Sequence, residues 1–263
     1  MTDPTPVNPY QAPQSEEFGS EGAIEVPGDF VGKLVLGLRL LAGNLPIIAP
    51  VVLTVWLPAH VLIEALVARS AAPDDPFAAL PLTNLVEAFF GPVISGAVIC
   101  ILAERLEGRR ISYFEAMAVG VQNWGRLFVA RLIASCLVLL GCLALIVPGI
   151  VLAVRYSLID EVVVLEGASA NACRARSDQL VRGKGGLIFL SGFVCFTALL
   201  TFAVAIGVFL QTVPALDSRW ANIGVQCLIN ILSMLISCVL FLYYRESRGL
   251  PELASETKSD GFF

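Results

Sequence analysis

The stretch LIASCLVLLGCLALIVPGIVLAV, from Leu132 to Val154, contains no charged side chain and is interrupted only by Pro148 and Gly149. Crossing a bilayer takes about 20 mainly apolar residues, because each helical residue rises about 1.5 Å across roughly 30 Å of hydrocarbon. The stretch is therefore long enough to form one membrane span. A tight turn at the Pro-Gly pair would instead send the chain back toward the side from which it came.

Lys and Arg decide between these two topologies, because short cytoplasmic loops hold an excess of both residues. With one span here the total is five, and the connection around Arg110 lies across the membrane from the connection around Lys184. With a turn at Pro148-Gly149 the total is six, and both connections share one face. Two basic residues then lie outside, Arg69 and Arg219, and thirteen lie inside, namely Lys33, Arg39, Arg105, Arg109, Arg110, Arg126, Arg174, Arg176, Arg182, Lys184, Arg245, Arg248 and Lys258. The charge distribution predicts six spans with both termini in the cytoplasm.

The predicted fold class is all-α: a polytopic membrane bundle of six transmembrane helices in three hairpins, with short interfacial amphipathic helices. Residues 29–246 form this membrane domain. Residues 1–28 are acidic and rich in Pro, so we expect a disordered cytoplasmic tail that cannot bury enough apolar surface to fold. Residues 247–263 form a second, short cytoplasmic tail. The predicted spans cover residues 45–67, 85–103, 127–147, 150–165, 187–210 and 223–244.

The composition agrees with a membrane protein. Of the 263 residues 57% are apolar and 15% are charged, whereas soluble domains average about 45–50% apolar with Gly included and about 25% charged. The first apolar run follows an acidic segment, which is unlike a cleavable signal peptide, so we expect an uncleaved anchor. We place the chain in the inner, or plasma, membrane. The formal charge of −5 gives no support for nucleic-acid binding.

The three connections on the inner face share a pattern: a short polar helix, then Gly or Asn, then a span. Residues 29–44 form the first unit. Ser112 and Glu115 form a capping box that begins the second, a helix over residues 113–121, and residues 169–183 form the third, with Gly183 as its C-terminal cap. Such helices lie at the headgroup boundary with basic side chains toward anionic lipid. The alternative is three ordinary basic loops that look alike because the topology demands Lys and Arg in each.

The run PGIVLAVRYSLIDEVVVLEGASANACRARSDQLVRGKGGLIF, residues 148–189, resembles the membrane domain named after bacterial glycerophosphoryl diester phosphodiesterases and related six-helix membrane families of unknown function. Where members of that family hydrolyse glycerophosphodiesters, the reaction belongs to a separate soluble barrel domain. We find no counterpart of that barrel in this sequence, so the resemblance implies a membrane fold and no chemistry. The residues that carry it are Pro148, Gly149, Tyr156, Glu166, Gly167, Ala172, Ser177, Leu180 and Gly183.

Ionisable side chains inside the predicted spans are expected to face one another, because a charge at membrane depth costs about 2.5–3.5 kcal/mol on insertion scales. Helix rise places Arg155 and Glu87 at a similar depth near the outer face. Arg131 should lie level with Asp160 or Glu161 near the inner face. We therefore predict two interhelical pairs, Arg155 with Glu87 and Arg131 with one of the two acids. They either fix helix register or form a substrate or proton pathway, and the small number of balanced charges favours register.

The last span carries polar residues on one helix face. We expect this face to look inward and to hold helices together through hydrogen bonds, since a pore lining would carry more charge. His60 has no partner ligands nearby in the sequence, and the seven cysteines show no metal-ligand spacing. We therefore predict neither a metal nor a cofactor. The residues of this polar face are Gln226, Asn230, Ser233 and Ser237.

The sequence lacks the motifs of phosphate-binding loops, GxSxG hydrolases and HExxH metalloproteases. Our first hypothesis is an integral membrane protein without catalytic machinery, acting as a scaffold, a regulator or a lipid-associated protein whose basic inner face contacts anionic lipid or a partner protein. The alternative is a small-solute transporter or channel that uses the Arg155 and Glu87 layer. A weaker alternative is a membrane-embedded lipid-modifying enzyme with a lateral groove that ends at Glu161.

Overall fold

The computed structural model describes residues 26–69, 79–212 and 219–259, and every regular element in these ranges is a helix. Five of the helices, α1, α2, α3, α7 and α8, are long and apolar enough to cross a membrane. The predicted all-α membrane class is therefore confirmed. The helices are α1 (Phe30–Val67), α2 (Leu80–Leu106), α3 (Tyr113–Ala144), α4 (Ile146–Arg155), α5 (Ile159–Glu166), α6 (Ala172–Val181), α7 (Gly185–Thr212) and α8 (Arg219–Ser259).

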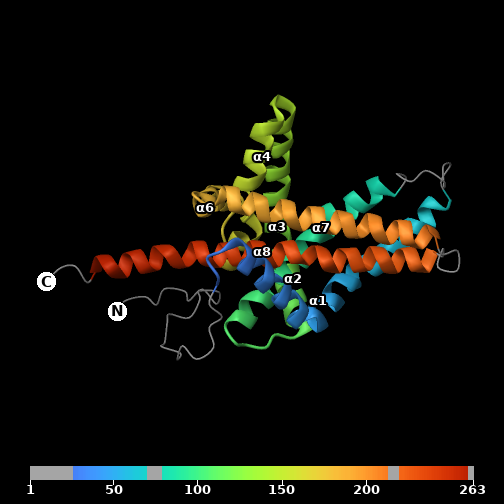
Figure 1. Cartoon of the computed structure of the whole chain (residues 1–263), viewed down its shortest axis with the longest axis horizontal. Helices are drawn as coiled ribbons and strands as arrows, with labels where there is room; N and C mark the ends of the chain where they lie inside the picture. Colours follow the sequence, from blue (N-terminus) through green and yellow to red (C-terminus); the bar gives the residue numbers. More distant parts are fainter. Residues whose placement is uncertain (1–25, 70–78, 213–218, 260–263) are drawn as a thin grey trace, which may run out of the picture.

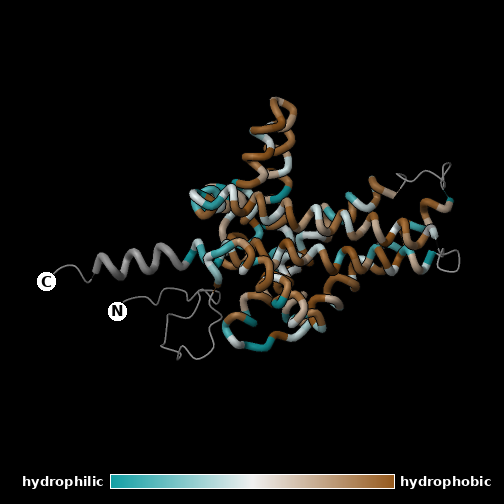
Figure 2. The backbone as a smooth tube through the Cα atoms, viewed as in Figure 1, coloured by the Kyte–Doolittle hydropathy of each residue, from teal (hydrophilic) through white to brown (hydrophobic). Residues whose placement is uncertain are grey.

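The long helices pack across the predicted hairpins as well as within them. α7 and α8 run side by side, and α1 packs against α8 (Figure 1). α2 packs mainly on α3, and α3 continues into a hairpin with α4 that stands out across the direction of α7 and α8 (Figure 1). Apolar residues dominate this hairpin as well as α7 (Figure 2). The surface of the hairpin tip is apolar because Leu143, Leu145 and Ile146 are all at least 70% exposed.

The chain does turn back within the uncharged stretch, but it turns at Leu145. This residue is extended, with φ −165° and ψ 144°, between the end of α3 and the start of α4. Pro148 and Gly149 lie in the first turn of α4 instead of forming the corner. Proline is well tolerated there, because the first N–H groups of a helix have no intrahelical partner.

Close packing of glycines holds the two arms of the hairpin together. A Cβ atom on Gly149 would lie 2.7 Å from the backbone nitrogen of Cys142, and one on Gly141 would lie 3.0 Å from Cα of Gly149. Both distances are too short for a side chain, so the backbones of the two arms are in direct contact. Small residues permit the same approach between helices in membranes.

The predicted span at residues 150–165 is divided into two short helices. α4 ends at Arg155 and α5 begins at Ile159. Ser177 of α6 lies at this break: its Oγ donates to the carbonyl oxygen of Arg155 at 2.7 Å and accepts from the N–H of Leu158 at 3.3 Å. A side chain therefore satisfies two backbone groups that a continuous helix would have paired internally.

The repeat of short helix and span holds for only one of the three connections. α1 continues through residues 43–44, where Asn44 Nδ2 donates to the carbonyl oxygen of Leu40 at 2.8 Å. α3 begins at the predicted capping box of Ser112 and Glu115 but continues through residues 123–125 without a break. Only α6 is a separate helix, followed by Gly183 with φ +81°. Asn44 and Asn123, the predicted stop residues of the first two connections, each bond to a carbonyl of their own helix and do not end it.

The buried core forms where α1, α2 and α8 meet, with a second cluster between α8 and the α3, α5, α6 and α7 segments. Tyr243 and Tyr244 of α8 are completely buried in the second cluster. α8 continues to Ser259, so part of the predicted tail at residues 247–263 is helical. Most of the predicted N-terminal tail, residues 1–25, lies outside the described residues.

Candidate functional site: a charged layer and an inner groove

Arg131 is the centre of a charged layer between α2, α3 and α5. Its Nε donates to both carboxylate oxygens of Asp160, at 3.0 and 3.1 Å, and its Nη2 donates to Asp160 Oδ2 and to Ser95 Oγ. The Arg131 and Asp160 side chains are 30% and 20% exposed. The structure thus joins Arg131 to one of the two acids that the sequence placed at its level.

Two more carboxylates belong to this layer. A Cβ atom on Gly91 would lie 2.6 Å from Glu87 Oε1 and 3.1 Å from Arg131 Nη1, so Glu87 lies beside Arg131 in the space that Gly91 leaves open. Glu161 is 2% exposed, and its Oε2 has no hydrogen-bond partner among the described residues. Asp160 and Glu87 therefore flank the Arg131 guanidinium, and Glu161 follows Asp160 directly in α5.

The predicted pair of Arg155 and Glu87 is wrong. Arg155 Nε instead forms an ion pair with Asp178 Oδ1 at 3.3 Å, and Arg182 Nη2 forms another with Asp178 Oδ2 at 3.0 Å. The cause is the break after α4, which ends the helix at Arg155 and brings it beside α6. The prediction treated residues 150–165 as one straight helix, so it assigned Arg155 a depth that the broken helix does not give.

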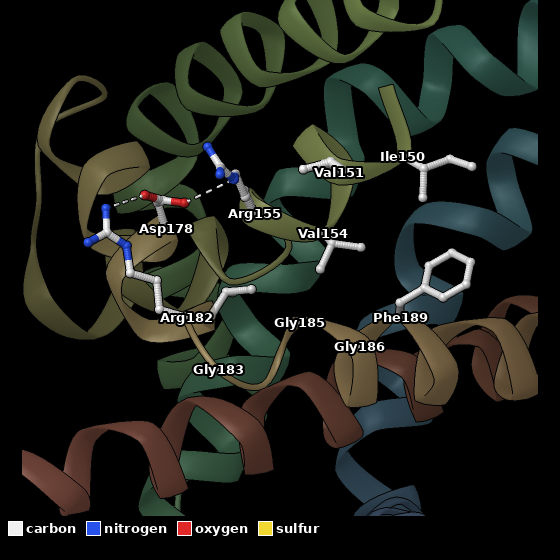
Figure 3. A pocket seen from close by; sticks show the side chains of 11 residues that line it. Ile150, Val151, Val154, Arg155, Asp178, Arg182, Gly183, Gly185, Gly186 and Phe189 are labelled. Atoms are coloured by element: carbon white, nitrogen blue, oxygen red, sulfur yellow. Dashed lines mark hydrogen bonds and ion pairs between the residues drawn. The ribbon is translucent and has the colours of Figure 1, made fainter. Parts of the chain in front are cut away.

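Arg155, Asp178 and Arg182 form the polar end of a groove between α4, α6 and the start of α7 (Figure 3). The groove has a volume of about 390 Å³. Its other end is apolar: Ile150 and Phe189 lie there, away from the guanidinium groups (Figure 3). The Arg155 and Arg182 side chains are 55% and 74% exposed. This groove does not extend to Glu161, which lies in the charged layer.

A second polar network fastens the start of α1 and α7 to α8. Glu246 Oε2 forms ion pairs with Lys33 Nζ at 3.3 Å and with Lys184 Nζ at 3.1 Å. Lys33 also donates to the carbonyl oxygen of Gly28 at 2.8 Å and lies over the ring of Tyr243. Sequence reasoning missed this network, because its members are distant in the chain and Lys33 and Lys184 fit an ordinary basic connection.

Most residues that carry the family resemblance shape the connection from α4 to α7. Glu166 forms an ion pair with Arg176 Nε at 3.0 Å and accepts a hydrogen bond from Tyr244 Oη at 3.1 Å. Gly167 and Gly183 have positive φ angles of 64° and 81°, which favour glycine. Tyr156 caps the C-terminal end of α4, Ala172 begins α6, and Leu180 is buried. These residues therefore specify a fold.

Replacing Ser177 tests this structural role. Ser177→Ala leaves the carbonyl of Arg155 and the N–H of Leu158 without their side-chain partner, so we expect a loss of about 1–3 kcal/mol in the free energy of unfolding. Denaturant unfolding in detergent micelles measures this loss. Thr201→Ala is the control, because Thr201 Oγ1 bonds only the carbonyl of Thr197 in its own helix and is exposed. Equal stability of the two variants would contradict the proposed role of Ser177.

The polar face of the last predicted span points inward only in part. Asn230 Nδ2 lies 2.9 Å from His60 Nε2 of α1, and Ser233 Oγ donates to the carbonyl of Asn230. Ser237 is half-buried, but Gln226 is exposed and does not join this contact. The prediction that all four residues face the bundle interior is wrong for Gln226, because Ile223 and Cys227 occupy the buried face of this turn of α8 and Gln226 lies outside it.

Among the described residues, no group of three or more His, Cys, Asp or Glu side chains is arranged to hold a metal ion. Cys173 is buried in α6, and this burial raises the pKa of its thiol. A raised pKa keeps the thiol protonated at neutral pH and therefore weakly nucleophilic. Its Sγ donates to the carbonyl of Ala170, which fits a packing role.

Comparison with known proteins relates the chain to bacterial membrane proteins. It is 27% identical over 152 residues to a UPF0259 membrane protein of Yersinia pestis (strain Pestoides F), and the match covers 58% of each chain. The UPF0259 membrane protein of Yersinia pseudotuberculosis serotype IB (strain PB1/+) matches with the same identity and coverage. The chain thus matches a little over half the length of these relatives. No family model and no solved structure matches it.

The similarity supports a multi-pass membrane protein. The names of the relatives state that they are membrane proteins and nothing about activity. The resemblance to the membrane domain of glycerophosphoryl diester phosphodiesterases gains no support from these comparisons, since the relatives found carry a different family name.

Proposed function

We propose that this protein is a non-catalytic membrane scaffold or regulator that crosses the inner membrane six times and holds anionic lipid at its cytosolic side. The observation that carries the proposal is the return of the chain through the α3–α4 hairpin. Arg126, within α3, and Glu166, at the end of α5, line one pocket of about 520 Å³. The chain therefore comes back beside the middle of α3 once it has passed through the hairpin and α5.

This return is consistent with basic connections that share one face. The arm from Arg126 to Leu145 is about 28 Å long at 1.5 Å per residue, close to the roughly 30 Å of the hydrocarbon core. The exposed apolar tip favours lipid on all sides of the hairpin. Because the hairpin stands across the direction of α7 and α8 (Figure 1), the two pairs must tilt in opposite directions to cross one bilayer.

Anionic lipid is the partner that exposed arginines on the cytosolic side would attract, at about 1 kcal/mol for each basic side chain near the surface. Reconstitution into nanodiscs of phosphatidylcholine, with and without phosphatidylglycerol, tests this. We expect the melting temperature to rise by a few degrees with phosphatidylglycerol, because lipid bound to the folded state stabilises it. We also expect both lipids to be recovered unchanged. Equal melting temperatures, or conversion of either lipid, would contradict the proposal.

A second candidate function is solute movement through the Arg131 layer. A cavity of about 510 Å³ between α3 and the α4–α5 segment is lined by Arg131 and Asp160. Charged side chains line this cavity, as they would line a transport pathway. As a candidate pathway it takes the place of the Arg155 and Glu87 layer that the sequence predicted. Leakage of a small solute from proteoliposomes tests this function. If the protein is a transporter, Arg131→Met should leak the solute more slowly than the native protein. Equal leakage rates for the native protein and Arg131→Met would favour the scaffold.

A further inference from the structure

We propose that the groove between α4, α6 and α7 is a binding site for one anionic phospholipid, with the lipid phosphate between Arg155 and Arg182 and an acyl chain against Ile150 and Phe189. This inference rests on the proposed function, because it assigns a specific binding site to a lipid that would otherwise contact only a general basic face. Its first support is that the groove is amphipathic along its length (Figure 3).

The polar end carries a net positive charge. One carboxylate, Asp178, pairs with two guanidinium groups at 3.3 and 3.0 Å. A guanidinium has five N–H donors, so each arginine keeps donors for another oxygen after it has paired with Asp178. Planar guanidinium groups bind phosphate oxygens through paired hydrogen bonds. Because the two arginines share a single carboxylate, some of their N–H donors remain available for such bonds.

The floor of the groove is backbone without side chains. Gly183, Gly185 and Gly186 line it, and Gly185 and Gly186 are the first two residues of α7. The first N–H groups of a helix lack intrahelical partners, and they add positive potential beside the two arginines. A Cβ atom on Gly186 would have no neighbour within 4 Å, so the floor is open at this position.

The apolar end matches an acyl chain. Ile150, Val151 and Phe189 are 40%, 45% and 45% exposed and lie on α4 and α7, both apolar helices that we place in the membrane. A soluble anion would use the arginines but would gain nothing from these walls. The juxtaposition of two arginines with an apolar wall therefore favours a phospholipid over free phosphate.

Native mass spectrometry of the full chain, extracted from nanodiscs of equal phosphatidylglycerol and phosphatidylcholine, tests the site. We expect one phosphatidylglycerol to remain bound, and Arg155→Gln with Arg182→Gln to weaken its retention about thirtyfold, the factor for about 1 kcal/mol per basic side chain. Asp178→Asn should strengthen retention, because it removes the competing carboxylate. Arg126→Gln is the control: an exposed arginine outside the groove, whose loss should change retention about twofold or less.

A second pair of variants leaves every charge in place. Gly186→Phe fills the open floor and should displace the lipid, whereas Gly192→Phe, at another open position of α7, should not. Two results together would overturn the groove as the binding site: an equal loss of phosphatidylglycerol retention in Arg126→Gln and in the Arg155 and Arg182 double variant, and full retention in Gly186→Phe. They would still be compatible with lipid bound to a general basic face. Retention of no phosphatidylglycerol by the native chain would contradict both proposals.

Discussion

Arg131→Met will lower the free energy of unfolding by about 2–3 kcal/mol, less than the loss for a fully buried ion pair because the Arg131 and Asp160 side chains are 30% and 20% exposed. The substitution removes every donor that Arg131 gives to Asp160 and Ser95. It also leaves Glu87 and Glu161 beside Asp160 without their shared cation. Three carboxylates without a counter-charge in an apolar surrounding are costly, and this makes the effect large.

Unfolding in detergent micelles measures the loss, and two further variants identify its cause. Arg131→Met combined with Asp160→Met should recover at least half of the stability, because both members of the pair are then apolar. Arg126→Met, on the same helix but exposed, should change the free energy of unfolding by less than about 0.5 kcal/mol. If the double variant were as unstable as Arg131→Met, the pair with Asp160 would not explain the role of Arg131.

Gly120→Ala will separate α2 from α3 and lower the free energy of unfolding by about 1–3 kcal/mol, the usual cost of overpacking. A Cβ atom on Gly120 would lie 2.3 Å from the carbonyl oxygen of Val93 and 3.2 Å from the backbone nitrogen of Ala97. Both neighbours are backbone atoms of α2, so no side-chain rotation relieves the clash. Gly96 of α2 lies opposite, with its Cβ position 3.0 Å from Cα of Gly120.

The matched control is Gly125→Ala, five residues later in the same helix. A Cβ atom on Gly125 has no neighbour within 4 Å. Alanine is favoured over glycine inside a helix by about 1 kcal/mol, so this variant should be as stable as the native protein or more stable. The same unfolding measurement separates the two variants. A stability loss of equal size in both would show that the close approach of α2 is not the reason for the loss in Gly120→Ala.

The sequence predicted the features that depend on a single local pattern. The uncharged stretch allowed a turn at Pro148-Gly149 and the basic residues beside it favoured one, and the structure turns three residues earlier, at Leu145. The spacing of Ser112 and Glu115 predicted a capping box, and both of its hydrogen bonds are present. Charges expected at a similar depth on neighbouring segments predicted that Arg131 contacts Asp160 or Glu161, and the structure shows the contact with Asp160.

The remaining features depend on contacts between distant segments. The break after Arg155 requires Ser177, and no local signal in residues 150–165 announces it. The pairing of Arg155 with Asp178 follows from that break, so a straight-helix prediction could not reach it. The crosswise direction of the α3–α4 hairpin depends on packing of the whole bundle, which hydropathy and loop charge do not encode (Figure 1).

Labelling of single cysteines from the two sides of the membrane tests the central claim, the return of the chain through the hairpin. Arg110→Cys, Ser169→Cys and Arg69→Cys each place one thiol at an exposed described position, in a chain whose native cysteines are replaced by Ala. We predict that a membrane-impermeant maleimide labels positions 110 and 169 only in inside-out vesicles, and position 69 only in intact cells. Labelling of positions 110 and 169 from opposite sides would contradict the account.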